Sequence, residues 1–190
     1  MIKLIIIRNT EAPSNVKYIV GGRCNESLTT NGITQAIQLK EQLKHIDYDL
    51  IFTSPVRRAI ETTRIINYKQ LPIKLDERIT ERDPGKLLLK DRNLVNKSEW
   101  NSLKYLKTKD GSETLLSLIK RVKAFIDYLK KNYNNKTIII VTHNSISRAF
   151  WLLNSDKTKS LEEINTYYQN SNTIQIYENY KCRNEVDFYG

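Results

Sequence analysis

Three short polar clusters follow apolar stretches in this sequence. Arg8-Asn9-Thr10 comes directly after a run of isoleucines, Ser54 to Arg58 follows a second apolar run, and Thr142-His143-Asn144 follows a third. An arginine side chain binds two phosphate oxygens through parallel hydrogen bonds, and the N-terminus of a helix adds backbone donors. If the three clusters lie together, their residue types are those of a phosphate-binding site.

The elements that would position these clusters follow from hydrophobic patterning. The apolar runs at Ile2 to Ile7, Asp49 to Thr53 and Lys136 to Val141 predict buried strands of a parallel sheet. Apolar residues at three- and four-residue steps predict helices between these strands. The predicted helices are Thr29 to Leu43, Val56 to Ile66, a helix that starts at Gly111-Ser112-Glu113 and runs to Leu129, and Ser145 to Leu153, with further short strands at Pro72 to Leu75 and Thr173 to Tyr177.

Alternating strands and helices define the α/β class with a largely parallel sheet. Ligand sites in such sheets form outside the carboxyl ends of the strands, which is where all three polar clusters fall. The helix from Thr29 is expected to have Thr29 as its N-cap and to bury a stripe that contains Ile33, Ile37 and Leu43. We therefore expect the arginines and the histidine to converge at one rim of the sheet.

Composition is that of a soluble globular protein. Of the 190 residues, 39% are hydrophobic and 27% are charged, which suits a single domain over residues 1–190. The first apolar run is too short for a signal-peptide core or a membrane span, and Cys24 and Cys182 form no disulfide or metal-binding pattern. These features predict a cytoplasmic protein without a membrane segment.

The net charge of +10 raises the question of nucleic-acid binding. Lysines are scattered along the whole chain among Asn, Ile and Tyr, and no basic segment alternates with aromatic residues. The distribution therefore argues against a nucleic-acid partner. A positive field also attracts a small phosphorylated anion to a pocket, which agrees with the three clusters.

Several segments together resemble the histidine phosphatase superfamily, which includes phosphoglycerate mutases, α-ribazole phosphatases and broad-specificity phosphatases. The segments occur in the family's order along the chain. They are IIIRNTEAPSN, GRCNESLTTNGITQA, FTSPVRRAIETT, ITERDPG, DGSETLLSLIKRVKAFI and IIIVTHNSISRAF. The resemblance implies a three-layer sandwich, with a mostly parallel central sheet flanked by helices.

The resemblance also implies a mechanism, which is phosphoryl transfer through a phosphohistidine without a metal or another cofactor. Arg8, Arg58 and His143 would hold the phosphoryl oxygens, and Glu81 would donate the proton to the leaving group. The substrate would be a small phosphorylated metabolite. The positions that would line the pocket are Asn15, Gly21, Gly22, Asn144 and Ser145.

Asn9 departs from the family pattern because it occupies the position of the histidine nucleophile. The lone pair of an amide nitrogen is delocalised into the carbonyl, so asparagine cannot attack phosphorus as imidazole does. This form of the chain is therefore expected to be inactive. Two explanations are open: an engineered replacement of a native histidine, which we favour because Arg8, Arg58, Glu81 and His143 are all present, or a natural pseudophosphatase that binds a phosphorylated ligand or a protein partner.

The substrate and the oligomeric state do not follow from the sequence. Family mutases are usually longer between the second arginine and the glutamate than the Arg58 to Glu81 stretch is here, so hydrolysis is preferred over the alternative of a phosphoglycerate-type mutase. A cap-like insertion is predicted over about residues 76–109. Its Lys86, Lys90, Arg92, Lys97 and Trp100 would suit an additional anionic group on the substrate, the alternative being a solvated lysine-rich loop.

Overall fold

The computed structural model describes residues 1–101, 108–154 and 173–178, and a central sheet organises this part of the chain. The sheet has five strands in the order β3-β2-β4-β1-β5. Neighbouring strands are parallel except for β5, which runs antiparallel to β1. The strands are β1 (Lys3–Arg8), β2 (Leu50–Thr53), β3 (Ile73–Leu75), β4 (Thr137–Thr142) and β5 (Ile174–Tyr177).

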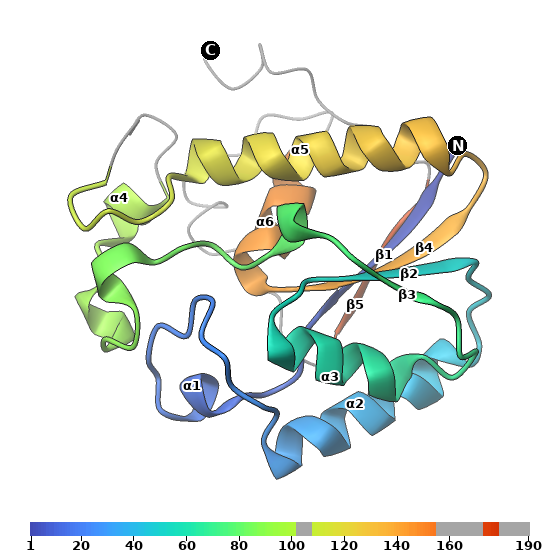
Figure 1. Cartoon of the computed structure of the whole chain (residues 1–190), viewed down its shortest axis with the longest axis horizontal. Helices are drawn as coiled ribbons and strands as arrows, with labels where there is room; N and C mark the ends of the chain where they lie inside the picture. The colour runs from blue at the N-terminus through green and yellow to red at the C-terminus, as the bar shows by residue number, and fades with distance from the viewer. Residues whose placement is uncertain (102–107, 155–172, 179–190) are drawn as a thin grey trace.

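Helices cover both faces of the sheet and make three layers (Figure 1). Alternate strand residues point to opposite faces, so Ile5 and Ile7 pack with α2 (Thr30–Leu43) and α3 (Arg57–Ile66). Leu4 and Ile6 belong to the second core, with α5 (Leu115–Asn132) and α6 (Asn144–Leu153). The predicted α/β sandwich with a mostly parallel sheet is confirmed.

The N-termini of two long helices show how local sequence sets their starts. The Thr29 side chain accepts a hydrogen bond from the Gly32 backbone N–H, as predicted for the N-cap of α2. The prediction that α5 starts at Gly111-Ser112-Glu113 is wrong, because Thr114 is its N-cap and accepts a hydrogen bond from Ser117. Gly111 has φ of +74°, which lies outside the helical region.

The predicted buried stripe of α2 is also wrong in part. Leu43 is buried, but Ile33 is 44% exposed and Ile37 is 50% exposed. The buried face is made instead by Gly32, Ala36, Leu39 and Leu43. The first residue of this face must be small, because a Cβ at Gly32 would lie 2.1 Å from the Glu11 carbonyl oxygen.

The described residues between β3 and α5, 76–101 and 108–114, form short turns rather than long elements. They are the 3₁₀ helices η1 (Glu77–Ile79), η2 (Gly85–Leu87) and η3 (Arg92–Leu94), followed by α4 (Lys97–Trp100). Backbone hydrogen bonds join this segment to the loop after α1 (Pro13–Val16), for example from Val20 to the Lys90 carbonyl and from Leu89 to the Val20 carbonyl. In Figure 1 the segment and the α1 loop lie together at one end of the sheet.

Two further points concern membrane-spanning helices and the cysteines. No helix in the described residues is long and apolar enough to cross a membrane. Cys182 lies outside the described residues, so the expectation for the two cysteines stays a prediction.

Candidate active site

Two adjacent parallel strands bring the first and third polar clusters together. Arg8 at the end of β1 is in register with Thr142 at the end of β4, and the Asn9 backbone N–H donates to the Thr142 carbonyl at 2.7 Å. The Ser54 backbone N–H likewise donates to the Val141 carbonyl at 3.0 Å, so the second cluster lies on the other side of β4. The predicted convergence at one rim of the sheet is therefore present.

His143 occupies the centre of this rim and is 1% exposed. Its Nδ1 lies 2.9 Å from Asn9 Oδ1, and its Nε2 lies 2.7 Å from Ser54 Oγ. Asn9 Nδ2 donates to the Thr10 carbonyl at 2.8 Å, which directs Oδ1 toward the imidazole. Because Oδ1 only accepts, we assign the proton of neutral His143 to Nδ1, with the Ser54 hydroxyl donating to Nε2.

The environment of His143 strongly disfavours its charged form. Burial lowers the pKa of His143 well below its ordinary value, and the positive charges of Arg58 and Arg8 lower it further. The imidazole is therefore neutral at neutral pH. This agrees with the assigned hydrogen-bond pattern, in which one ring nitrogen donates and the other accepts.

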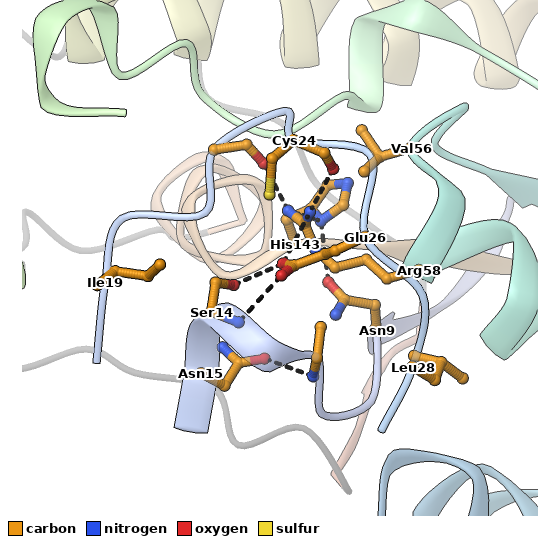
Figure 2. Close-up of polar contacts among 12 residues, drawn as sticks. Asn9, Ser14, Asn15, Ile19, Cys24, Glu26, Leu28, Val56, Arg58 and His143 are labelled. Carbon is orange, nitrogen blue, oxygen red and sulfur yellow. Dashed lines mark hydrogen bonds and ion pairs between the residues drawn. The ribbon is translucent and has the colours of Figure 1, made fainter. Parts of the chain in front are cut away.

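Arg58 is held in place by the loop that precedes α2 (Figure 2). Its Nη2 donates to the Gly22 carbonyl at 2.6 Å, and its Nη1 donates to the Cys24 carbonyl at 3.3 Å. Nη2 also lies 3.4 Å from His143 Nδ1. The Arg58 side chain is 6% exposed, so its orientation is set by protein contacts before any ligand binds.

The partly exposed carboxylate of Glu26 joins the same loop to α1 and to Arg58. Glu26 accepts hydrogen bonds from the Ser14 backbone N–H at 3.0 Å and from the Ser14 hydroxyl at 2.5 Å. Its Oε1 lies 3.5 Å from Arg58 Nη1, and both side chains are mostly buried. Figure 2 shows Glu26 between Ser14 and Arg58, so this carboxylate ties the loop to the arginine.

A cavity of about 240 Å³ opens beside these residues. Most of the predicted site residues line it, from the ends of β1 and α6, from α3 and from the loops between β1 and α2. They are Arg8, Asn9, Asn15, Gly21, Gly22, Arg58, Glu81, Asn144 and Ser145. His143 is not part of this lining, since it lies beneath the wall against Asn9 and Arg58.

Glu81 and the neighbouring Arg82 also line the cavity. The Glu81 carboxylate accepts a hydrogen bond from the Arg82 backbone N–H at 2.7 Å. The guanidinium of Arg82 lies over the Trp100 ring, 3.8 Å from its centroid, and burial lowers the pKa of Arg82 to about 10. Arg82 therefore stays charged at neutral pH although it is 2% exposed.

Sequence reasoning missed several residues of this site. The cavity lining also includes Ser14, Tyr18, Val20, Arg82, Pro84, Val95 and Arg148. Arg148 follows Asn144 by one helical turn, and this spacing is a signal that the sequence offered. Glu26 has no comparable signal, because its partners Ser14 and Arg58 are brought to it by the loop.

The described residues contain no group of three or more His, Cys, Asp or Glu side chains arranged to hold a metal ion. The charges around the cavity are instead mainly those of arginines. Arginine side chains can neutralise a bound phosphate group and hydrogen-bond to it at the same time. The arrangement is thus suited to binding a phosphorylated anion.

Comparison with known proteins agrees with this class of site. The family model of the histidine phosphatase superfamily (branch 1) matches residues 4–188. The chain belongs to this superfamily.

The most similar proteins of known name include two phosphatases. Phosphoserine phosphatase 1 from Hydrogenobacter thermophilus is 30% identical over 168 residues, which are 84% of this chain and 80% of that protein. The adenosylcobalamin/α-ribazole phosphatase of Escherichia coli is 28% identical over 152 residues, which are 76% of this chain and 74% of that protein. The chain therefore has a phosphatase scaffold.

A solved structure supports the fold independently. Bacillus stearothermophilus YhfR superimposes with a TM-score of 0.83 at 21% identity, and the match covers 96% of this chain and 95% of that one. The chain thus shares its fold with this solved structure.

Proposed function

We propose that the cavity binds the phosphate group of a small phosphomonoester between Arg8 and Arg58. The observation that carries the proposal is that both arginines are nearly buried and line one cavity, beside the first residues of α6. Asn144 and Ser145 at this helix N-terminus offer backbone N–H groups to an anion. The cavity of about 240 Å³ is smaller than is usual for drug-sized ligands, roughly 300–1,000 Å³, which favours a small metabolite.

In its present form the site binds this ligand without turning it over. Asn9 occupies the position where a histidine would attack phosphorus, and its amide is not a nucleophile. Loss of a covalent nucleophile lowers the rate by roughly 10⁴ to 10⁶-fold, so only binding and electrostatic stabilisation are left. Asn9 forms part of the cavity wall, and its side chain is held by contacts with His143 and with the Thr10 carbonyl.

A histidine at position 9 would complete the chemistry. In the first step an imidazole nitrogen forms a bond to phosphorus while the ester P–O bond breaks, and Glu81 gives its proton to the leaving alkoxide. In the second step water attacks the phosphohistidine, Glu81 accepts the proton of the water, and inorganic phosphate leaves. Arg8 and Arg58 neutralise the phosphoryl oxygens in both steps.

His143 enters this proposal as a positioning residue for position 9. Its ring contacts Asn9 and Ser54 and does not line the cavity. The implied contact of His143 with phosphoryl oxygens stays a prediction. Such a contact requires the side chain at position 9 or the Arg58 guanidinium to shift from the arrangement seen here.

The experiment is an Asn9→His substitution, assayed without metal against a panel of small phosphate esters. We expect release of inorganic phosphate and an acid-labile phosphohistidine, both absent from the unchanged chain and from an Asn9→Ala control. Formation of a phosphorylated product in place of inorganic phosphate would favour the mutase alternative. A correctly folded Asn9→His protein that binds phosphate but forms neither phosphohistidine nor product would contradict the proposed scaffold chemistry and favour a binding protein.

Codon 9 of the natural gene would show whether Asn9 is an engineered or a natural residue. We favour an engineered substitution, because Arg8, Arg58 and Glu81 line one cavity together and His143 lies directly behind them. A histidine at codon 9 of the natural gene is the expected result. An asparagine codon would identify a natural pseudophosphatase instead.

A further inference from the structure

The cavity has more positive charge on its wall than one phosphate group needs. The described residues that line the cavity include six basic side chains but only one carboxylate, that of Glu81. The basic residues are Arg8, Arg58, Arg82, Arg92, Lys97 and Arg148. Glu26 offsets part of the charge of Arg58 from behind the wall. A phosphomonoester dianion held by Arg8 and Arg58 would leave Arg82, Arg92 and Lys97 without a ligand charge.

The remaining cations come from different elements and are positioned independently of the phosphate site. Arg92 begins η3, and its Nε donates to the Ile19 carbonyl at 2.9 Å, with the guanidinium 5.7 Å from the centroid of the Tyr18 ring. Lys97 begins α4. The contacts of Arg92 with Ile19 and Tyr18 hold its side chain at the cavity. Because the Ile19 carbonyl accepts only from Nε, the two Nη groups of Arg92 can still donate to a ligand.

Arg82 adds a buried cation to the same region. Its Nε donates to the Glu113 carbonyl at 2.5 Å and its Nη1 to the Trp100 carbonyl at 2.6 Å, while Nη2 is buried and has no hydrogen-bond partner among the described residues. The Glu113 carboxylate pairs with Arg121, at 2.7 Å and 2.9 Å. A buried guanidinium that donates only to neutral carbonyl oxygens is stabilised further by a nearby anion.

We propose that Arg82, Arg92 and Lys97 form a second anion-binding subsite, and that the ligand therefore carries a carboxylate or a second phosphate besides its ester phosphate. The proposal rests on the proposed function, since the first subsite is the phosphate site at Arg8 and Arg58. The proposal also favours one of the two interpretations of the segment before α5. Under the favoured one, basic residues of this segment bind an additional anionic group of the ligand; under the other, the segment is a solvated lysine-rich loop. Arg92, Lys97 and Trp100 line the cavity, whereas Lys86 and Lys90 do not.

A matched pair of ligands tests the subsite. The compounds 3-phosphoglycerate and glycerol 3-phosphate differ at one end, where the first has a carboxylate and the second a hydroxymethyl group. With the unchanged chain, which binds without turnover, titration calorimetry should give about tenfold tighter binding for 3-phosphoglycerate. Propane-1,3-diol bisphosphate, compared with its monophosphate, shows whether a second phosphate serves as well as a carboxylate.

Variants locate the effect on the protein. Lys97→Gln and Arg92→Gln should each reduce the preference for 3-phosphoglycerate to about threefold or less, while the affinity for glycerol 3-phosphate changes by less than about twofold. Lys86→Gln and Lys90→Gln remove the same charge from the same segment, outside the cavity lining, and should leave the preference unchanged. This comparison separates a local contact from the general effect of net charge.

The possible failures are distinguishable. Equal affinities for ligands with one and two anionic groups would overturn the second subsite and leave the phosphate site standing. An equal loss of preference in Lys86→Gln and Lys97→Gln would also overturn it, since the preference would then come from net charge alone. Failure of inorganic phosphate and of every ester to bind would overturn the proposed function, and the second subsite with it.

Discussion

His143 Nδ1 lies 2.9 Å from Asn9 Oδ1, between two residues that are 134 positions apart in the chain. The strands β1 and β4 are adjacent and in register at their carboxyl ends. Asn9, which follows β1, therefore lies next to His143, which follows β4. This contact assigns the proton of neutral His143 to Nδ1. It also gives position 9 a defined orientation toward the rim.

The tautomer of His143 is the first testable consequence. We expect nitrogen-resolved NMR of the imidazole to show a protonated Nδ1 and an unprotonated Nε2, because Asn9 Oδ1 accepts and the Ser54 hydroxyl donates. In an Asn9→Asp variant the same proton should remain on Nδ1. A resonance pattern with the proton on Nε2 would show that the Ser54 hydroxyl accepts and that the assignment is wrong.

Stability should depend on pH through His143. Burial lowers its pKa in the folded state, whereas the unfolded chain has an ordinary histidine pKa of about 6.5. Below that pH the unfolded state binds more protons, so the free energy of unfolding falls as the pH decreases, by up to about 2 kcal/mol between pH 7.5 and pH 5.

Urea denaturation at several pH values measures this dependence. A His143→Gln variant should lose most of it in the same window, while His45→Gln, which alters an exposed histidine, should keep it. An unchanged slope in His143→Gln would show that other groups cause the pH dependence. Phosphate should oppose the effect, because a bound anion favours the charged imidazole.

Glu26 is expected to stabilise the loop that carries Gly22 and Cys24. A Glu26→Ala substitution removes the acceptor of both Ser14 hydrogen bonds and the carboxylate beside Arg58, all in a largely buried setting. We expect a loss of about 2 kcal/mol in the free energy of unfolding. Glu41→Ala, which removes an exposed pair with Lys44, should change the stability by less than about 0.5 kcal/mol.

A double-mutant cycle then tests the contact itself. Glu26→Ala and Ser14→Ala should be strongly non-additive, because either substitution removes the hydrogen bond between the two side chains. Additive effects would mean that Glu26 stabilises the protein in another way.

Gly22 is expected to tolerate substitution poorly. Its φ is +48°, its carbonyl accepts from Arg58, and a Cβ there would lie 2.5 Å from Pro84 Cγ. Gly22→Ala should therefore cost more than the roughly 1–2 kcal/mol of a left-handed backbone alone, and it should weaken phosphate binding.

Gly111 supplies the matched control for that substitution. It also has a positive φ, of +74°, but a Cβ there meets no atom within 4 Å. Gly111→Ala should show the backbone cost alone, with phosphate affinity unchanged. Equal destabilisation of the two variants would rule out the contact with Pro84 as a source of strain.

Much of this structure could be predicted from local pattern. The strands that end at Arg8 and Thr142 are continuous apolar runs. Strands that are covered by helices on both faces have this continuous pattern, so the runs could be recognised as buried strands from the sequence. The buried face of α2 could not be predicted from Ile33 and Ile37, because close contact with the Glu11 backbone selects Gly32 for burial and leaves both isoleucines exposed.

By itself the sequence determined the α/β class, the strand ends that carry Arg8, Asn9 and His143, and the presence of a non-nucleophilic amide side chain at position 9. These are local properties, set by hydrophobic period and by side-chain chemistry. Only the tertiary structure decided that His143 lies beneath the cavity wall, that Glu26 joins Ser14 to Arg58, and that Arg92 and Lys97 face the cavity while Lys86 and Lys90 do not. Those relationships depend on how irregular loops pack against the end of the sheet, and no periodic pattern records that packing.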